Sequence, residues 1–227
     1  MKEASPEIID KWTNADNAYF YENIPVEIMH KYAKKGGFDD CCDVEAIHDY
    51  LIDAEHILDL GAGYGRAIKY LSEHFPKAKL TALERSSSFC AYMQEQYHGL
   101  VDINQADLNK FIPKEKFNAI LWLWANISDF AKEEHIAVLT KIISWLQPKG
   151  KLFLDILLDE FKPSHLDIEY PDNKNYVAVE DDLTIHGYVP TVHEIKEYAQ
   201  ILKLKIVKEI PFITQTNRHR VIFVLGR

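Results

Sequence analysis

The sequence predicts a doubly wound α/β fold: a seven-stranded, mostly parallel sheet with an antiparallel last strand and helices on both faces. Short runs of apolar, β-branched residues alternate with longer segments of helical period, which is typical of a parallel sheet covered by helices. A glycine-rich turn follows the first strong strand. The last two strands are separated only by residues 211–220, too few for a helical crossover, which predicts a hairpin.

Each element is predicted from a local pattern. Apolar runs predict strands over residues 56–60, 79–84, 101–105, 117–124, 151–158, 203–210 and 221–225. Helical periodicity predicts helices over residues 66–75, 87–97, 131–146 and 192–202. The third helix should pack on the sheet through one apolar face, made by Ile136, Leu139, Ile143 and Leu146. The turn at 147–150 should end that helix, and Thr191 with Glu194 has the spacing of a capping box for the fourth.

The length of 227 residues favours one folding unit with additions. We expect an N-terminal helical cap over residues 1–43 and a ligand-binding domain over 44–227. An insertion at 159–190 breaks the alternation of strands and helices. Open α/β sheets bind ligands outside the carboxyl ends of their strands, so the cap and the insertion are candidates for a lid and an acceptor pocket.

The composition excludes several classes of protein. A net charge of -9 argues against a broad nucleic-acid surface, and no apolar run approaches the roughly 20 residues of a membrane helix. The N-terminus lacks the pattern of a secretory signal, and the three cysteines fit neither a disulfide framework nor a zinc site. We therefore expect a cytoplasmic protein, monomer or homodimer, with no metal, no membrane and no nucleic acid among its partners.

The glycine-rich turn predicts a nucleoside site. It reads D-L-G-A-G-Y-G-R over residues 59–66, and glycines let a ligand approach the backbone closely. Glu84 ends the next strand, about 20 residues on, where a carboxylate can accept hydrogen bonds from ribose hydroxyls. Arg66 stands where a dinucleotide fingerprint needs glycine, and the Lys-Ser/Thr ending of a phosphate-binding P-loop is missing.

Residues 57–66 (ILDLGAGYGR) resemble the first motif of the class I S-adenosylmethionine-dependent methyltransferases, and the predicted order of strands resembles theirs. The resemblance implies that the glycines run beneath the methionine part of S-adenosylmethionine, with Asp59 near its amino group. It further implies a ribose contact at Glu84, adenine contacts at Arg85, Asp107 and Leu108, and a sulfonium contact at Leu123 and Trp124. The implied co-substrate residues are Asp59, Gly61, Ala62, Gly63, Gly65, Glu84, Arg85, Asp107, Leu108, Leu123, Trp124 and Tyr19.

The resemblance implies transfer of a methyl group to a small-molecule acceptor through an oxygen or nitrogen atom. Aromatic faces favour a sulfonium cation, and Tyr19 and Tyr21 are candidates, although both can equally pack an N-terminal helix. His186, His193 and Asp129 are candidates for a general base, and each also has a structural interpretation. The loop after the fourth strand lacks the Asn/Asp-Pro-Pro-aromatic run of methyltransferases that act on nucleobase amines.

Two alternative functions stay open at this point. One is a non-catalytic module that keeps the nucleoside pocket for regulation or assembly. The other is an NAD(P)-dependent dehydrogenase, which would need glycine in place of Arg66. Aminopropyl transfer from decarboxylated S-adenosylmethionine is disfavoured because only Asp129 is acidic in the loop after the fourth strand.

Overall fold

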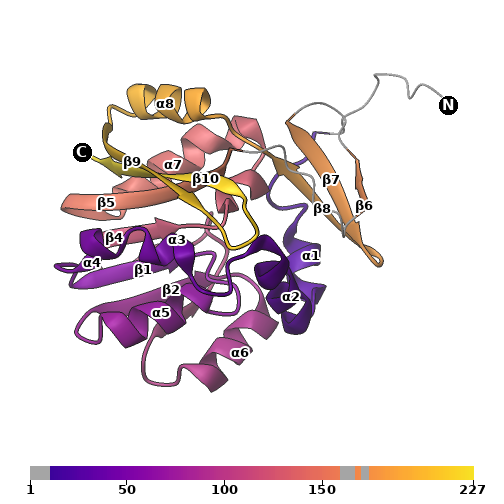
Figure 1. The fold of residues 1–227 in the computed structure, drawn as a ribbon, viewed down its shortest axis with the longest axis horizontal. Coiled ribbons are helices and arrows are strands. Elements are labelled where there is room, and N and C mark those ends of the chain that lie inside the picture. The colour runs from indigo at the N-terminus through magenta and orange to yellow at the C-terminus, as the bar shows by residue number, and fades with distance from the viewer. Residues whose placement is uncertain (1–10, 159–166, 170–173) are drawn as a thin grey trace.

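The described residues, 11–158, 167–169 and 174–227 of a computed structural model, are built around one seven-stranded sheet. Its order is β3-β2-β1-β4-β5-β10-β9 (Figure 1). The strands are β1 (His56–Leu60), β2 (Lys79–Glu84), β3 (Asp102–Gln105), β4 (Phe117–Trp122), β5 (Leu146–Leu157), β9 (Lys205–Ile213) and β10 (His219–Gly226). Strands β1 to β5 pair in parallel, whereas β10 pairs antiparallel with β5 and β9. The predicted fold class, including the reversed last strand, is confirmed.

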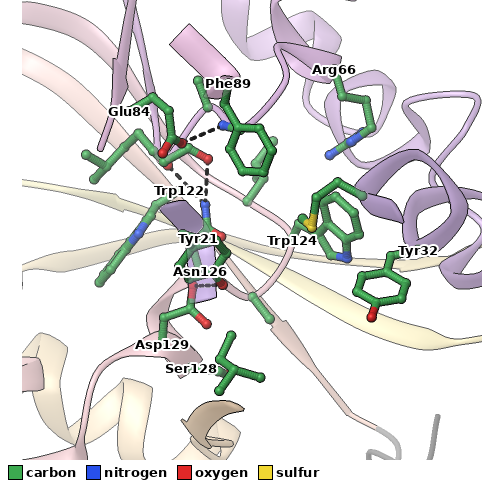
Figure 2. Close-up of a pocket in the computed structure, with 18 of the residues that line it drawn as sticks. Tyr21, Tyr32, Arg66, Glu84, Phe89, Trp122, Trp124, Asn126, Ser128 and Asp129 are labelled. Atoms are coloured by element: carbon green, nitrogen blue, oxygen red, sulfur yellow. Dashed lines mark hydrogen bonds between the residues drawn. The ribbon is translucent and has the colours of Figure 1, made fainter. Parts of the chain in front are cut away.

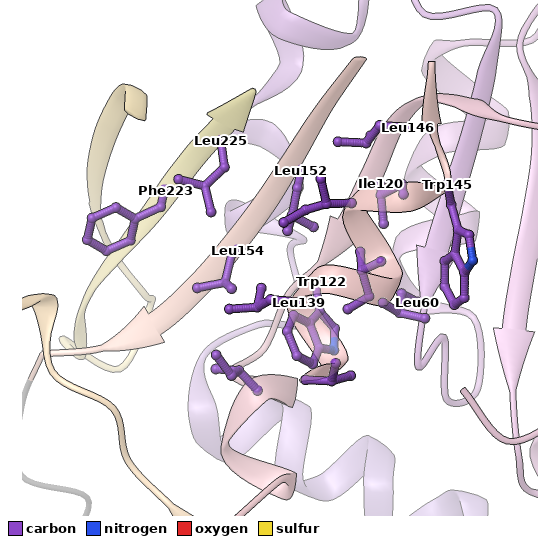
Figure 3. Close-up of a cluster of buried hydrophobic side chains, with 14 of the residues drawn as sticks. Leu60, Ile120, Trp122, Leu139, Trp145, Leu146, Leu152, Leu154, Phe223 and Leu225 are labelled. Carbon is purple, nitrogen blue, oxygen red and sulfur yellow. The ribbon is translucent and has the colours of Figure 1, made fainter. Parts of the chain in front are cut away.

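Helices cover both faces of this sheet. They are α4 (His48–Leu51), α5 (Arg66–His74) and α6 (Ser87–Gln96) on one face, and α7 (His135–Ser144) and α8 (Val192–Ile201) on the other. Alternate side chains of a strand point to opposite faces, so Ile120 and Trp122 of β4 pack toward α7 while Ala119 and Leu121 pack toward α5. Figure 3 shows the cluster beneath α7, where Leu139 meets Trp122.

Several element boundaries differ from the prediction, most clearly those of β4, of the helix from residue 131 and of β5. Strand β4 ends at Trp122, because Trp124 and Ala125 adopt φ of 55° and 56° and turn the chain out of the sheet. The predicted helix from residue 131 begins as a 3-10 turn, η2 (Lys132–Glu134), and ends at Ser144. Residues 147–150 belong to β5 rather than to a separate turn. The capping box is confirmed, because the Thr191 hydroxyl accepts from Glu194 N at 3.2 Å.

The N-terminal segment and the insertion pack together at the carboxyl ends of the strands. The segment forms α1 (Ala18–Asn23), α2 (Val26–Gly36) and α3 (Cys42–Glu45). The insertion forms a small antiparallel sheet of β6 (Asp167–Glu169), β7 (Asn175–Glu180) and β8 (Leu183–Tyr188), which lies beside α1 in Figure 1. Phe20 of α1 and Phe89 of α6 share one buried cluster with Tyr176 and Ile185.

Residues 1–10 of the predicted cap, and residues 159–166 and 170–173 of the predicted insertion, lie outside the described residues. The boundary between cap and domain at residue 43 therefore stays a prediction. Among the helices described, none has the length and apolar character to cross a membrane.

Candidate functional site

A cavity of about 310 Å³ opens at the carboxyl ends of the strands. Its floor comes from the turns that follow β1, β2, β3 and β4, and its cover comes from α1, α2, β7 and β8. Figure 2 shows Glu84 and the pair Tyr21–Asp129 lining this same cavity. The ligand end of the sheet is thus enclosed by the two segments that the sequence predicted to lie there.

The glycine-rich turn gives the cavity a floor without side chains. Gly61, Gly63 and Gly65 have φ of 69°, 54° and 86°, a left-handed conformation that favours glycine. A Cβ on Gly63 would meet no heavy atom within 4 Å, whereas a Cβ on Gly61 would lie 2.7 Å from Asn126 Nδ2. The open space above Gly63 lets a ligand rest directly on the backbone there, whereas Gly61 is covered by the Asn126 side chain.

Glu84 lies next to this turn and organises it. One carboxylate oxygen accepts from Gly63 N at 2.8 Å, and the other accepts from Arg85 N at 2.7 Å and Ser86 N at 2.8 Å. Burial raises the pKa of Glu84, and these three donors offset the rise only in part. A carboxylate offers about four acceptor positions, so roughly one is left for a ligand hydroxyl.

The side chain of Arg66, which stands where a dinucleotide fingerprint has glycine, makes structural contacts. Its guanidinium forms two hydrogen bonds with the fully buried Asp43, at 2.7 Å and 2.6 Å. It lies 5.3 Å from the ring centre of Phe38 and 5.6 Å from that of Trp124. Asp59 lines the cavity nearby, and burial raises its pKa to about 7. The side chain of Arg66 therefore joins the turn to the N-terminal segment.

Asp107 and Arg85 form a second polar group on the floor. Arg85 donates to Asp107 at 3.0 Å and to the backbone oxygen of Asn14 at 3.1 Å. Asp107 also accepts from Asn109 N at 2.7 Å, so it caps its own turn while it lines the cavity. Leu108 lies beside it in the lining.

The turn after β4 has an unusual backbone. Trp124 and Ala125 are consecutive residues with left-handed φ, a conformation that persists only where surrounding contacts hold it. Ala125 N donates to Asp155 at 3.2 Å, and the buried Asp155 also binds Arg220, at 2.6 Å at the shortest. Asn126 donates to the backbone oxygens of Leu60 and Gly61, at 3.1 Å and 3.2 Å. Leu123, Trp124 and Asn126 are thereby held over the glycine-rich turn.

Asp129 and Tyr21 form a buried acid-hydroxyl pair in the cavity. The Tyr21 hydroxyl donates to Asp129 Oδ2 at 2.7 Å. Burial raises the pKa of Asp129 to about 7, a value suited to a general base at neutral pH. The side chains of Asn14 and Asn17 donate to the Asp129 backbone oxygen at 3.0 Å and 3.1 Å, which fixes the position of this residue.

Three predicted site residues lie outside the cavity. Tyr19 is 64% exposed and borders a separate surface hollow, because it lies on the outer side of α1. His186 follows Ile185 on β8, so the two side chains point to opposite faces; Ile185 faces the cavity and His186 stacks on Trp12 at 5.8 Å. His193 is solvent-exposed on α8 and pairs with Glu197. None of the three can act on a ligand in this cavity.

Gly65, the residue before α5, is also absent from the lining, and a Cβ on it would meet Tyr97 and Met93. The remaining predicted residues line the cavity: Asp59, Gly61, Ala62, Gly63, Glu84, Arg85, Asp107, Leu108, Leu123, Trp124 and Asp129. Sequence reasoning missed Asn14, Phe38, Asn126 and Arg220. Only Asn126 carried a local signal, because it belongs to the loop after β4. The other three reach the site through contacts between distant segments.

Part of the chain matches a known family. Residues 57–150 match the sequence pattern of the methyltransferase domain family. The chain is 26% identical over 146 residues to (S)-tetrahydroprotoberberine N-methyltransferase of Eschscholzia californica, covering 60% of this chain and 37% of that protein. It is 26% identical over 149 residues to trans-aconitate 2-methyltransferase of Escherichia coli, covering 63% and 57%. The match thus spans less than two thirds of the length of either relative.

The fold has solved counterparts. The crystal structure of the glycopeptide N-methyltransferase MtfA complexed with S-adenosyl-L-methionine superposes with a TM-score of 0.63 at 14% identity, covering 84% of this chain and 93% of that one. At this identity the similarity establishes a shared fold. Residues 57–150 therefore match the methyltransferase domain family, and the sheet with its reversed last strand is the fold shared with a solved S-adenosylmethionine-bound methyltransferase.

Proposed function

We propose that this protein transfers the methyl group of S-adenosylmethionine to an oxygen or nitrogen atom of a small molecule. The observation that carries the proposal is one enclosed cavity with the glycine-rich turn and Glu84 on its floor and the Tyr21–Asp129 pair beside them. The relatives are named for two different acceptors, trans-aconitate and (S)-tetrahydroprotoberberine, so the names leave the acceptor open. The described cysteines are all free thiols, which supports a reducing compartment such as the cytoplasm.

The floor of the cavity fits the co-substrate. The open surface over Gly63 admits a ligand against the backbone, Glu84 can accept from a ribose hydroxyl, and Asp107 can accept from an adenine amino group. Asp59 is a buried carboxylate near the glycine-rich turn, suited to a ligand ammonium group. When bound, S-adenosylmethionine would supply a methyl group on a sulfonium ion; an in-line nucleophile attacks the methyl carbon as the bond to sulfur breaks, with S-adenosylhomocysteine as the leaving group.

The other half of the cavity fits the acceptor. Its lining is mainly apolar and aromatic, with Tyr21, Phe89, Tyr176 and Ile185, so it excludes water from a bound small molecule. Asp129 is the one carboxylate in this half among the described residues, and it can take the proton that an acceptor hydroxyl or ammonium loses. Tyr21 holds its carboxylate in place through the hydrogen bond of 2.7 Å.

A binding and turnover experiment separates this function from its alternatives. We expect calorimetry to show micromolar binding of S-adenosylhomocysteine and no comparable binding of NADH or NADPH. A panel of small hydroxy, amino and carboxylic compounds with S-adenosylmethionine should then yield S-adenosylhomocysteine and a methylated product in mass spectra. Tight nicotinamide binding would favour the dehydrogenase, and nucleoside binding without turnover across the panel would favour the non-catalytic module.

The role of Asp129 has its own test. Asp129→Asn should keep its affinity for S-adenosylhomocysteine and lose methyl transfer by about 100-fold or more, the usual contribution of a general base. Because the pKa of Asp129 is raised to about 7, the ionised base is lost as pH falls below 7, and the rate should fall with it. The Tyr21 hydrogen bond lowers this pKa, so Tyr21→Phe should move the rate profile to higher pH. A profile that Tyr21→Phe leaves in place would contradict the assignment.

A further inference from the structure

The charges that line the cavity are divided between its two ends. Asp59, Glu84, Asp107 and Asp129 lie at the ends of β1, β2, β3 and β4 or in the turns that follow them. Of the basic side chains in the lining, Arg85 pairs with Asp107. The others lie where α2, the start of α5 and the hairpin of β9 and β10 meet, and they are Lys35, Arg66, Arg218 and Arg220. Arg218 and Lys35 therefore belong to the end of the cavity near α2 and the hairpin, and Glu84 and Asp107 to the other end.

Two of these basic side chains already have a partner. Arg66 binds Asp43 and Arg220 binds Asp155, and both carboxylates are fully buried behind their arginines. Within the part of the chain that the structure describes, no ion pair or side-chain hydrogen bond is formed by Arg218 or Lys35. An acidic protein that keeps two unpaired cations on one cavity has charge available for an anion.

Arg218 and Lys35 lie in segments that contact each other. Gln215 N donates to Gly37 O at 3.2 Å, which joins the hairpin loop to the end of α2. Thr214 and Arg218 close the loop through a backbone hydrogen bond of 3.0 Å. Arg218 is partly buried and Lys35 is exposed at the rim. The loop therefore holds the Arg218 backbone in place beside an apolar lining that includes Phe38 and Trp124.

The order of strands separates these cations from the ribose site. Glu84 ends β2, and Arg220, two residues after Arg218, pairs with Leu157 at the end of β5. Four strand spacings separate β2 from β10, which corresponds to roughly 19 Å. The methionine part of the co-substrate extends only roughly 10 Å from its ribose at ordinary bond lengths. By this spacing the backbone at Arg218 lies beyond its reach, next to the end of β5, whereas Arg66 directly follows the glycine-rich turn.

We propose that the acceptor carries a carboxylate or phosphate group, apart from its methylated atom, and that Arg218 binds this group with Lys35 at the rim. This inference rests on the proposed function and specifies its substrate class. A guanidinium fork matches the two oxygens of such an anion, and partial burial strengthens the interaction relative to bulk water.

The test uses simple probes on the full chain. Benzoate, phenyl phosphate and the neutral benzamide are titrated by ligand-observed NMR, with and without S-adenosylhomocysteine. At least one of the two anions should bind about tenfold more tightly than benzamide. Arg218→Gln should abolish this preference. Lys208→Gln removes a charge from the exposed side of β9, outside the cavity lining, and should leave the preference intact.

Arg218→Gln also shows whether Arg218 binds a carboxylate of the acceptor or the carboxylate in the amino-acid part of the co-substrate. Arg218→Gln should bind S-adenosylhomocysteine and methylthioadenosine, which lacks the amino-acid part, as the unmodified protein does. A selective loss of S-adenosylhomocysteine binding would assign Arg218 to the co-substrate and overturn the proposal. No preference for either anion over benzamide, or a preference that survives Arg218→Gln, would also overturn it. Titration of the unmodified protein with S-adenosylhomocysteine tests the proposed function separately, since the anion preference is measured with and without the nucleoside.

Discussion

Replacing Glu84 by glutamine tests the centre of the candidate site with almost no change in shape. In the structure, Gly63 N donates to one carboxylate oxygen, while Arg85 N and Ser86 N donate to the other. In Glu84→Gln, one of these oxygens becomes an NH₂ group and faces a backbone donor instead of accepting from it. At least one buried N–H group therefore loses its partner.

The magnitude follows from this hydrogen-bond count. A buried donor without a partner costs about 1–3 kcal/mol, so Glu84→Gln should lower the free energy of unfolding by that amount. The carboxylate also has only about one acceptor position free. To accept from both ribose hydroxyls, the carboxylate would have to give up one of its three backbone donors. We expect a loss of about 2 kcal/mol in binding, or roughly 30-fold in the dissociation constant.

Calorimetry with S-adenosylhomocysteine, at a temperature well below the unfolding transition of both proteins, measures this loss. Glu115→Gln is the matched control, because Glu115 is exposed and pairs with Lys79 at the opposite end of β2. The control should leave nucleoside affinity unchanged. If folded Glu84→Gln binds S-adenosylhomocysteine as tightly as the control, the ribose contact and the reasoning built on it are refuted.

Three further substitutions test the structure around the site. In urea unfolding, Gly61→Ala should lower the free energy of unfolding by more than Gly99→Ala does. Both glycines have left-handed φ, but only a Cβ at Gly61 meets another group, Asn126 at 2.7 Å. Equal decreases in the two variants would contradict this packing. Asp155→Asn leaves its buried arginine without a counter-ion and should cost about 3–5 kcal/mol, against the ~1 kcal/mol of an exposed pair. Burial lowers the pKa of His135 to about 4, so at lower pH the unfolded chain binds a proton that the folded protein does not. The free energy of unfolding should therefore decrease as pH falls from about 6.5 toward 4, by up to about 1.4 kcal/mol per pH unit. His135→Gln should flatten this dependence, and an unchanged slope would count against it.

The floor of the site was predictable from the sequence because local signals specify it. A strand, a glycine turn and a helix start within ten residues predict both the fold and the nucleoside end, and Glu84 follows from its distance to that turn. The capping box at Thr191 was predictable for the same reason. The end of β4 was not, because the left-handed backbone at Trp124 and Ala125 depends on Asp155, some 30 residues away.

The cover of the site was less predictable because distant contacts build it. Asn14 binds Asp129 across 115 residues of sequence, and no local pattern marks either residue for the other. His186 was a reasonable candidate by residue type, yet the register of β8 turns it toward Trp12. A shift of one residue along a strand reverses its side chains, and the sequence of an isolated short strand does not specify that register.

Phe38 has a consequence for how the protein could be dissected. Its ring lies 5.0 Å from the guanidinium of Arg220 and 5.3 Å from that of Arg66, and the second of these arginines depends on Asp43 for its counter-ion. A shortened chain that starts at residue 44 would lack both the ring and that carboxylate, and would expose a cation beside the seven-stranded sheet. We therefore expect the N-terminal segment to be needed for folding, so that a trimmed version is recovered as insoluble or partly unfolded material.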